Sequence, residues 1–125
     1  HRDMYLDENG DFISEKSKTG PLAVGVPGTI AGVFAVHEKL GSLPIEEILA
    51  PVIKLAEKGY IVTKFQANRI AHFKEIFLKT NGENSIYTEA YKEGDTIINS
   101  AIANTLKRLS ENGRFEFYKG ETAKK

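Results

Sequence analysis

The chain has 125 residues, which is the usual size of one domain and is enough to bury a core without disulfide or metal support. Its 17 Lys and Arg residues balance its 17 Asp and Glu residues, so a nucleic acid or an anionic membrane, which needs a clustered positive field, is not an expected partner. The lack of cysteine excludes disulfides, thiolate catalysis and cysteine zinc sites, and no apolar run is long enough to span a membrane.

The N-terminal part predicts strands and loops. Two short apolar segments, 4–6 and 12–13, flank a polar stretch that contains Asn9-Gly10. Because glycine tolerates a positive φ, Asn-Gly between apolar segments is typical of a β-hairpin, here with a loop or bulge at Gly10. The two segments that follow are expected to be a polar loop and a short strand: 14–21 and 22–26.

Four helices are expected in the rest of the chain. The first has small or apolar side chains up to Val36, which predicts a helix buried on most of its sides. The second begins at Pro44, and Pro51 is expected to kink or break it, because proline lacks an N–H and clashes with the preceding turn. The expected N-caps are Thr29, Thr63 and Asp95. The predicted helices are 29–40, 44–58, 64–79 and 95–112, with 60–62 extended.

The residue types alone do not predict a complete active site. His37 and His72 lie on different helices without metal-ligand spacing, so both are interpreted as structural. The turn at 25–28 precedes a helix and could hold an anion, but it has neither P-loop nor dinucleotide-binding spacing, and a tight strand-to-helix turn is favoured. The hydroxyl residues of the first loop have no paired histidine, which disfavours a nucleophile-base pair: Ser14, Ser17 and Thr19.

Five segments in order resemble the γ-glutamyltranspeptidase family. Arg2-Asp3-Met4-Tyr5 is similar to its Arg-Asp-Met-Phe stretch, with Tyr5 in place of the commoner Phe. Residues 25–32 (GVPGTIAG) are similar to its Gly-x-Pro-Gly-Thr-x-Ala-Gly signature. The other three are AEKGYIV at 56–62, GDT at 94–96 and G…FYKG at 113–120. Each match is weak alone, but five with consistent order and spacing over residues 2 to about 120 are specific.

The resemblance implies an enzyme that cleaves the γ-glutamyl bond of glutathione and passes the group to water, an amino acid or a peptide through a threonine acyl-enzyme. It implies a precursor that cleaves itself into two subunits, with the nucleophile and oxyanion hole in the small subunit. Because nothing here matches the nucleophile segment, the chain is expected to be a non-catalytic internal fragment of the large subunit, with the small subunit as its partner and no cofactor or metal. His1 in place of Met and the Lys125 end agree with that expectation.

The resemblance also implies a fold, a site residue and a compartment. We expect a mainly α piece with a small β-hairpin, part of the αββα sandwich of the N-terminal-nucleophile hydrolases. Residues 1–125 would be a single partial domain, with β and loop segments over about 1–26 and four helices over about 28–120. Arg2 is the one site residue carried over, at the position that binds the α-carboxylate of the γ-glutamyl group. The family location implies a periplasmic, secreted or cell-surface protein.

Two alternatives remain at the level of the sequence. One is a helical module that binds a protein partner through an exposed apolar patch. The other is a related acylase of the same superfamily, which would act on another amide. From residue types alone Arg2 is an ordinary surface residue, although a planar arginine fork is well suited to bind a carboxylate.

Overall fold

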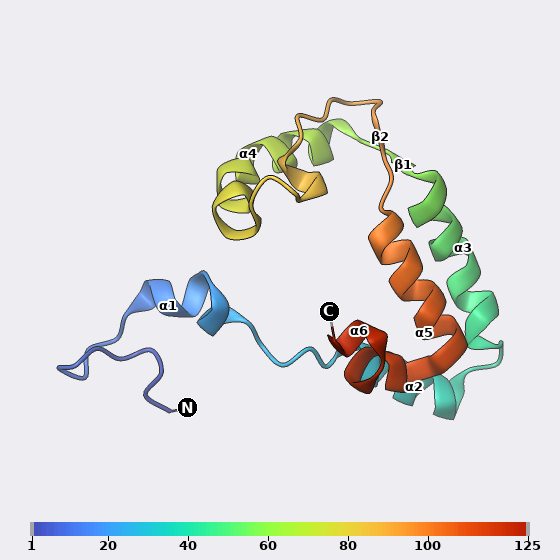
Figure 1. The fold of residues 1–125 in the computed structure, drawn as a ribbon, viewed down its shortest axis with the longest axis horizontal. Helices are drawn as coiled ribbons and strands as arrows, with labels where there is room; N and C mark the ends of the chain where they lie inside the picture. Colours follow the sequence, from blue (N-terminus) through green and yellow to red (C-terminus); the bar gives the residue numbers. More distant parts are fainter. Residues whose placement is uncertain (1, 125) are drawn as a thin grey trace.

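The structure is a computed structural model, which describes residues 2–124; the predictions that involve His1 and Lys125 lie outside these residues. It is mainly helical with one two-stranded antiparallel sheet (Figure 1). The elements are α1 Ser14–Lys18, η1 Pro21–Ala23, α2 Thr29–Leu40, α3 Ile45–Lys58, β1 Tyr60–Ile61, α4 Lys64–Asn81, η2 Ile86–Thr88, β2 Thr96–Ile97, α5 Ser100–Lys119 and α6 Glu121–Lys124.

Helices α2, α3, α5 and α6 form a helical body. Figure 1 shows that α3 runs beside α5, and that α2 and α6 lie at the C-terminal end of α5. The pairing of α3 with α5 follows from the apolar repeat of α3, because its half-buried residues recur at helical spacing. These residues are Ile45, Leu49, Ile53 and Ala56.

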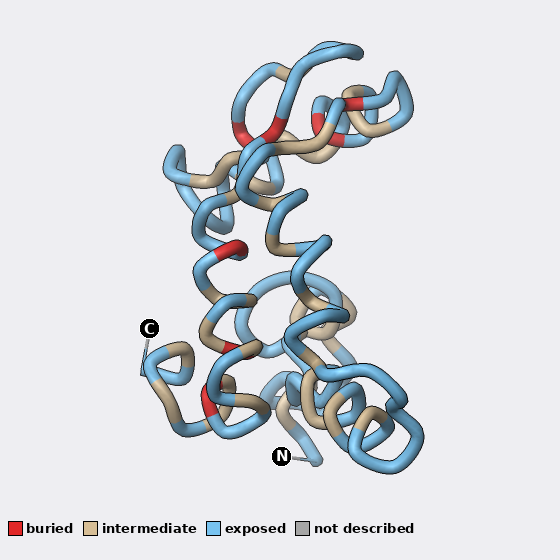
Figure 2. Tube along the Cα trace, turned by 90° about the vertical axis from the view of Figure 1, so that its right-hand side faces the viewer, coloured by how far each residue is buried: buried red, intermediate tan, exposed pale blue. Residues whose placement is uncertain are grey.

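The best-buried core lies outside that body, where α4 meets the two strands. Tyr60 pairs with Ile97 and Ile61 with Thr96, so after α4 the chain returns to lie beside β1. Val62, Ile70 and Ile97 are buried together. Figure 2 shows that buried positions are few elsewhere and lie mainly along α5. The sheet thus joins a small α4 lobe to the helical body.

Several sequence predictions are confirmed. Helix α2 spans residues 29–40 as expected, and the segment expected to be extended contains β1, Tyr60–Ile61. Thr63 caps α4 in a capping box, because its hydroxyl accepts from the Gln66 amide at 3.2 Å while the Gln66 side chain accepts from the Thr63 amide at 2.8 Å. Helix α4 begins at Lys64 as expected and extends two residues beyond the expected end at 79, to Asn81, where Gly82 follows with a φ of 69°. Gly113, with a φ of 63°, interrupts α5 at the expected stop, although helical structure resumes beyond it.

The N-terminal predictions hold only in part. The hairpin is reduced to one antiparallel bridge between Leu6 and Phe12, with Gly10 at a φ of 86° in the intervening turn. The segment 14–21 is not all loop. Helix α1 forms over Ser14–Lys18, where the segment contains no glycine or proline, and Gly20 and Pro21 follow its end. The segment 22–26 is not a strand, because proline presets the φ of a 3₁₀ turn that begins at Pro21.

Two helix predictions are wrong, and a third holds at most in part. Asp95 does not cap a helix, because β2 follows it, and Asn99 caps α5 instead by accepting from the Ile102 amide at 3.0 Å. Thr29 is the first helical residue and not the N-cap. Of the two outcomes expected at Pro51, a kink or a break, the break does not occur, because α3 runs continuously from Ile45 to Lys58. None of the described helices is long and apolar enough to cross a lipid bilayer.

The prediction that α2 is buried on most of its sides is also wrong. None of its residues is buried in this structure, and Val36 and Leu40 are 60% and 80% exposed. Only the side of α2 that faces α5 is covered, where the half-buried Phe34 lies near Gly113. The apolar sequence of α2 therefore has no partner on its other sides within residues 2–124.

Candidate functional site

Arg2 lies in a turn ahead of the bridge between Leu6 and Phe12. Its side chain is 96% exposed, and its Nε is 3.9 Å from the Asp3 carboxylate, which is too long for a hydrogen bond. The guanidinium donors therefore face solvent and are accessible to an incoming carboxylate. Arg2 is the only site residue that the resemblance implied, so there is no second predicted site residue whose position could be compared with it.

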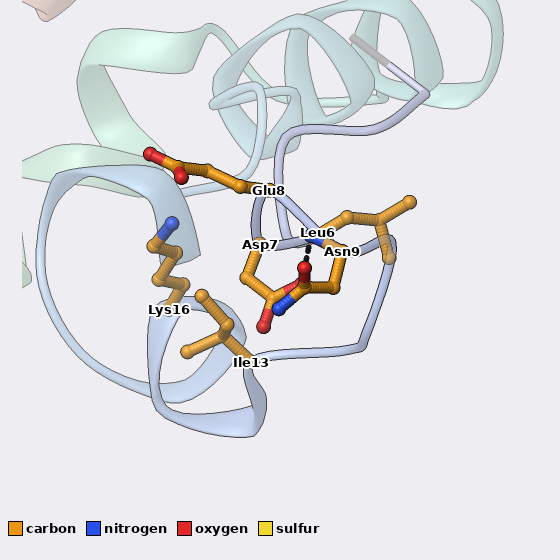
Figure 3. A pocket seen from close by; sticks show the side chains of 6 residues that line it. All are labelled: Leu6, Asp7, Glu8, Asn9, Ile13 and Lys16. Atoms are coloured by element: carbon orange, nitrogen blue, oxygen red, sulfur yellow. Dashed lines mark hydrogen bonds between the residues drawn. The ribbon is translucent and has the colours of Figure 1, made fainter.

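The loop that follows Arg2 is held by its own backbone and by Asp7. The Asp7 carboxylate accepts from the amides of Asn9 and Asp11 at 2.8 and 2.9 Å, and the Ile13 amide donates to the Tyr5 carbonyl at 2.8 Å. Figure 3 shows the shallow pocket at this loop, with the Asp7–Asn9 hydrogen bond inside it. Because Asp7 orders the turn, we interpret this carboxylate as structural.

Tyr5 ties the Arg2 segment to the next element. Its hydroxyl donates to the Leu22 carbonyl at 2.8 Å, and its ring meets Phe12 edge to face at a centroid distance of 6.4 Å. A phenylalanine, the commoner residue in the resembling family motif, could make the ring contact but not the hydrogen bond. The hydroxyl is thus an additional restraint on the segment that carries Arg2.

The Tyr118 hydroxyl lies where the segment 25–28 enters α2. The Tyr118 hydroxyl donates to the Pro27 carbonyl at 2.5 Å and accepts from the Ala31 amide at 3.1 Å. The Ala31 amide is one of the unpaired donors at the N-terminus of α2, and it is a donor that an anion there would use. The Tyr118 contact therefore disfavours the anion site. The predicted tight strand-to-helix turn is not formed either, because no strand precedes residues 25–28 and the segment is an irregular connection. Sequence reasoning missed the Tyr118 contact, although both segments carried the family resemblance.

Both described histidines are structural, as expected. The His37 Nε2 lies 2.7 Å from the Leu43 carbonyl and fixes the corner between α2 and α3. His72 contacts Phe73 edge to face at 4.8 Å, and the Arg69 guanidinium lies 4.5 Å above the same ring. Within residues 2–124 no group of three or more carboxylate or imidazole side chains could hold a metal ion.

A buried carboxylate that sequence reasoning missed lies where α6 folds against α5. Glu116 is 6% exposed and accepts from the Thr122 hydroxyl at 2.8 Å, the Thr122 amide at 3.0 Å and the Arg108 Nε at 3.0 Å. The hydrogen bond from the Thr122 hydroxyl is the main cause that lowers the pKa of Glu116, and the Arg108 guanidinium adds to it. With all these donors the carboxylate is a structural anchor and not a free acid or base.

The core tyrosines are not poised for proton transfer. Burial raises the pKa of Tyr60 and of Tyr91, so both hydroxyls stay protonated at neutral pH. The Ser17 hydroxyl donates to the Ser14 carbonyl at 2.8 Å within α1 and is not paired with a histidine. Among the described residues no hydroxyl is paired with a histidine as an assembled nucleophile, and Arg2 is exposed at the position that the resemblance singled out.

Comparison with known proteins gives the same family over the whole chain. The family model described as gamma-glutamyltranspeptidase matches residues 1–125. The glutathione hydrolase proenzyme of Escherichia coli K12 is 37% identical over 126 residues, covering 98% of this chain and 22% of that protein. The glutathione hydrolase proenzyme of Bacillus subtilis 168 is 40% identical over 126 residues, covering 98% of this chain and 21% of that protein.

The crystal structure of Helicobacter pylori gamma-glutamyltranspeptidase superimposes with a TM-score of 0.90 at 34% identity, covering 99% of this chain and 37% of that chain. The chain thus spans about a fifth of the length of the curated relatives it matches. The sequence, the fold and the five ordered motifs agree. The chain therefore belongs to the gamma-glutamyltranspeptidase family.

Proposed function

We propose that this chain is part of a γ-glutamyltranspeptidase that cleaves the γ-glutamyl bond of glutathione. The group would pass to water or to an amino acid or peptide acceptor through a threonine acyl-enzyme. The observation that carries this proposal is the family match over residues 1–125. The curated relatives named glutathione hydrolase proenzyme add support for the substrate and for a precursor. This match disfavours a stand-alone interaction module.

The chain would supply substrate positioning and not the bond-breaking step. Arg2 would bind the α-carboxylate of the γ-glutamyl group, because a planar fork of N–H donors matches two carboxylate oxygens and fixes their orientation. The exposed guanidinium supports this role. Holding that end of the substrate would place the γ-carbonyl for attack by a threonine of the small subunit, the proposed partner.

The proposal extends to the architecture and the location. Residues 1–125 would be one partial domain, the helical portion of the large subunit, within an αββα sandwich of the N-terminal-nucleophile type. The family also supports a periplasmic, secreted or cell-surface location. The proposed chemistry would need no cofactor, because the substrate contact would be an ion pair and the nucleophile would be a threonine side chain of the small subunit.

The test uses the full-length protein and a chromogenic γ-glutamyl anilide. Arg2→Lys keeps the charge and removes the bidentate fork, so kcat/KM should fall by about 10- to 100-fold, as expected for a lost charge-assisted hydrogen bond. Self-cleavage, followed by gel electrophoresis, should stay intact. The matched control is Arg114→Lys, the same change at an exposed site on α5, which should leave kcat/KM within about twofold of the parent value.

Two results would contradict the proposal at different points. Normal kcat/KM in Arg2→Lys would remove Arg2 from the site while leaving the family activity in place. An inactive parent that still cleaves itself would exclude the γ-glutamyl substrate and favour an acylase of the same superfamily.

A further inference from the structure

Two tyrosine hydroxyls hold the segment 22–28, called here the linker because it joins the N-terminal part of the chain to the helical body (Figure 1). At one end of the linker the Tyr5 hydroxyl donates to the Leu22 carbonyl at 2.8 Å. At the other end the Tyr118 hydroxyl donates to the Pro27 carbonyl at 2.5 Å. Both acceptors are backbone carbonyls, so each hydrogen bond restrains the main chain of the linker itself.

The backbone between these two hydrogen bonds has limited freedom. The linker starts in the 3₁₀ helix η1, where Pro21 presets the backbone, and Val24 is extended with φ and ψ of −79° and 122°. Val26 precedes Pro27, and the ring of a proline restricts the residue before it to extended conformations. Because the far end of the linker is bonded to Tyr118 on α5, a group bonded to the near end is held relative to the helical body.

Tyr5 is coupled to Arg2 through a short, closed turn. The Leu6 amide donates to the Asp3 carbonyl at 3.1 Å and closes the backbone between Arg2 and Tyr5. The Ile13 amide donates to the Tyr5 carbonyl at 2.8 Å and fixes the base of this turn. Three residues of backbone span at most about 11 Å. A displacement of Tyr5 is therefore passed on to the backbone of Arg2.

The position of the Arg2 guanidinium depends on this backbone. The side chain is 96% exposed, and the Asp3 carboxylate is 3.9 Å from its Nε, too far for a hydrogen bond that would orient it. A carboxylate is bound by two parallel N–H donors only when the planar fork faces it squarely. Small displacements of a positioning group carry large penalties in catalysis, so restraints on the Arg2 backbone affect substrate binding.

We propose that Tyr5 is a positioning residue for the γ-glutamyl substrate, because its hydroxyl fastens the backbone that carries Arg2 to the linker. This inference rests on the proposed function, since Arg2 is the group that Tyr5 positions. The Tyr5 hydroxyl itself touches neither the substrate nor the bond that is cleaved. A hydroxyl that only stabilised the fold would affect all substrates alike, whereas one that positions Arg2 matters only for substrates with an α-carboxylate.

Tyr5→Phe in the full-length protein tests this proposal, because it removes the hydroxyl and keeps the ring that contacts Phe12. Two chromogenic anilides are compared: the γ-glutamyl anilide and the 4-aminobutyryl anilide, which has the same amine and amide but no α-carboxylate. For the γ-glutamyl anilide, kcat/KM should fall by about two- to tenfold through a higher KM, as expected for one lost hydrogen bond that acts on binding. For the 4-aminobutyryl anilide, followed at higher enzyme concentration, kcat/KM should equal the parent value.

Two further variants complete the experiment. In the Arg2→Lys background the fork is already lost, so adding Tyr5→Phe should change kcat/KM by less than about twofold. The matched control is Tyr87→Phe, which removes a hydroxyl from a part-exposed ring in the α4 lobe and should leave kcat/KM unchanged for both anilides.

The outcomes separate this proposal from the proposed function. An equal fall of kcat/KM with both anilides, or full additivity of Tyr5→Phe with Arg2→Lys, would assign the hydroxyl to general stability and overturn the positioning role. An active parent that is weakened by Arg2→Lys but not by Tyr5→Phe would refute this proposal alone. A parent that does not hydrolyse the γ-glutamyl anilide would refute the proposed function and, with it, the positioning role of Tyr5.

Discussion

Glu116 shows how a single acidic residue can be tolerated in a sparse core. The carboxylate is 6% exposed, and its partners come from both sides of the bend at Gly120. Arg108 lies in the part of α5 before Gly113, and Thr122 lies on α6. The Glu116 carboxylate therefore connects α5 with α6. Removal of one partner from such a buried set is costly, because the remaining charge loses its counter-charge.

The pH dependence of stability should reveal this carboxylate. The pKa of Glu116 is lowered in the folded chain, so the stabilisation is fully present above the ordinary pKa of Glu and is lost as the pH falls through the lowered value. Glu116→Gln should therefore lower the Tm at pH 7, and the difference from the parent should shrink below about pH 4. Thermal unfolding by circular dichroism between pH 7 and 3 measures this.

The control for that experiment is Glu111→Gln, which changes an exposed carboxylate on the same helix. Its Tm should follow that of the parent at every pH, because an exposed carboxylate contributes little. A deficit for Glu116→Gln that stays constant down to pH 3 would contradict the assignment of the stabilisation to the ionised carboxylate.

At the scale of elements, Tyr118 connects two helices that are far apart in the sequence. Its hydroxyl is bonded to Pro27 and Ala31, which are 91 and 87 residues away, and it anchors the start of α2 on the last turns of α5. The ring of Phe34 approaches Gly113 nearby, so a hydrogen bond and an apolar contact both join α2 to α5. Because few contacts join α2 to α5, the loss of any one of them should have a measurable effect on stability.

Tyr118→Phe should weaken that junction. Loss of the two hydrogen bonds should reduce the free energy of unfolding by about 1–3 kcal/mol, at about 0.5–1.5 kcal/mol for each. Urea unfolding measures the total, and faster hydrogen exchange of the Ala31 amide localises it. Tyr87→Phe, which removes a hydroxyl from a part-exposed ring in the α4 lobe, should leave that amide unchanged. Unchanged exchange at Ala31 in Tyr118→Phe would show that the hydroxyl does not hold α2.

Helix ends separate what the sequence predicts from what it does not. Thr63 with Gln66 and the stop at Gly82 were predictable, because a capping box and a positive φ are set by residues close in sequence. Asp95 and Asn99 satisfy the N-cap rule equally well. The choice between them depends on the pairing of β2 with β1, which lies far back in the chain beyond α4, and local patterns do not contain that pairing.

In the candidate site, too, features set by residues close in sequence were predictable and features set by distant contacts were not. Arg2 was found only through a resembling motif, because its immediate neighbours give it no distinctive environment. The contact between Tyr118 and the turn at Pro27, and the contact of Glu116 with Thr122 around Gly120, depend on how helices meet. No periodicity or spacing rule predicts such meetings. The five ordered motifs were therefore more informative about function than the secondary structure.

At the scale of the whole molecule, the chain is an extended assembly of three parts. Figure 1 shows an N-terminal arm that contains α1 and η1, the helical body, and the α4 lobe attached through the two strands. Figure 2 shows that buried residues occur mainly in the lobe and along α5. A chain with its own complete core would be more compact.

The solution size of the 125-residue chain tests this description. A compact domain of this length has a radius of gyration of about 14 Å, and an unfolded chain about 36 Å. Small-angle X-ray scattering at low concentration should give an intermediate value with an elongated distance distribution. A value near the compact limit would mean that the parts collapse on one another, and a value near the unfolded limit would mean that the helices do not form without further chain.

The pairing of β1 with β2 has a consequence for variation in length. Because Tyr60 and Ile97 are neighbours, everything between them is an excursion whose two ends meet. Lengthening such an excursion adds only a small entropic cost, since the closure term grows with the logarithm of its length. Insertions and deletions among natural homologues should therefore concentrate between residues 62 and 95, while the flanking segments 45–61 and 96–119, which carry α3 and α5, should keep their lengths.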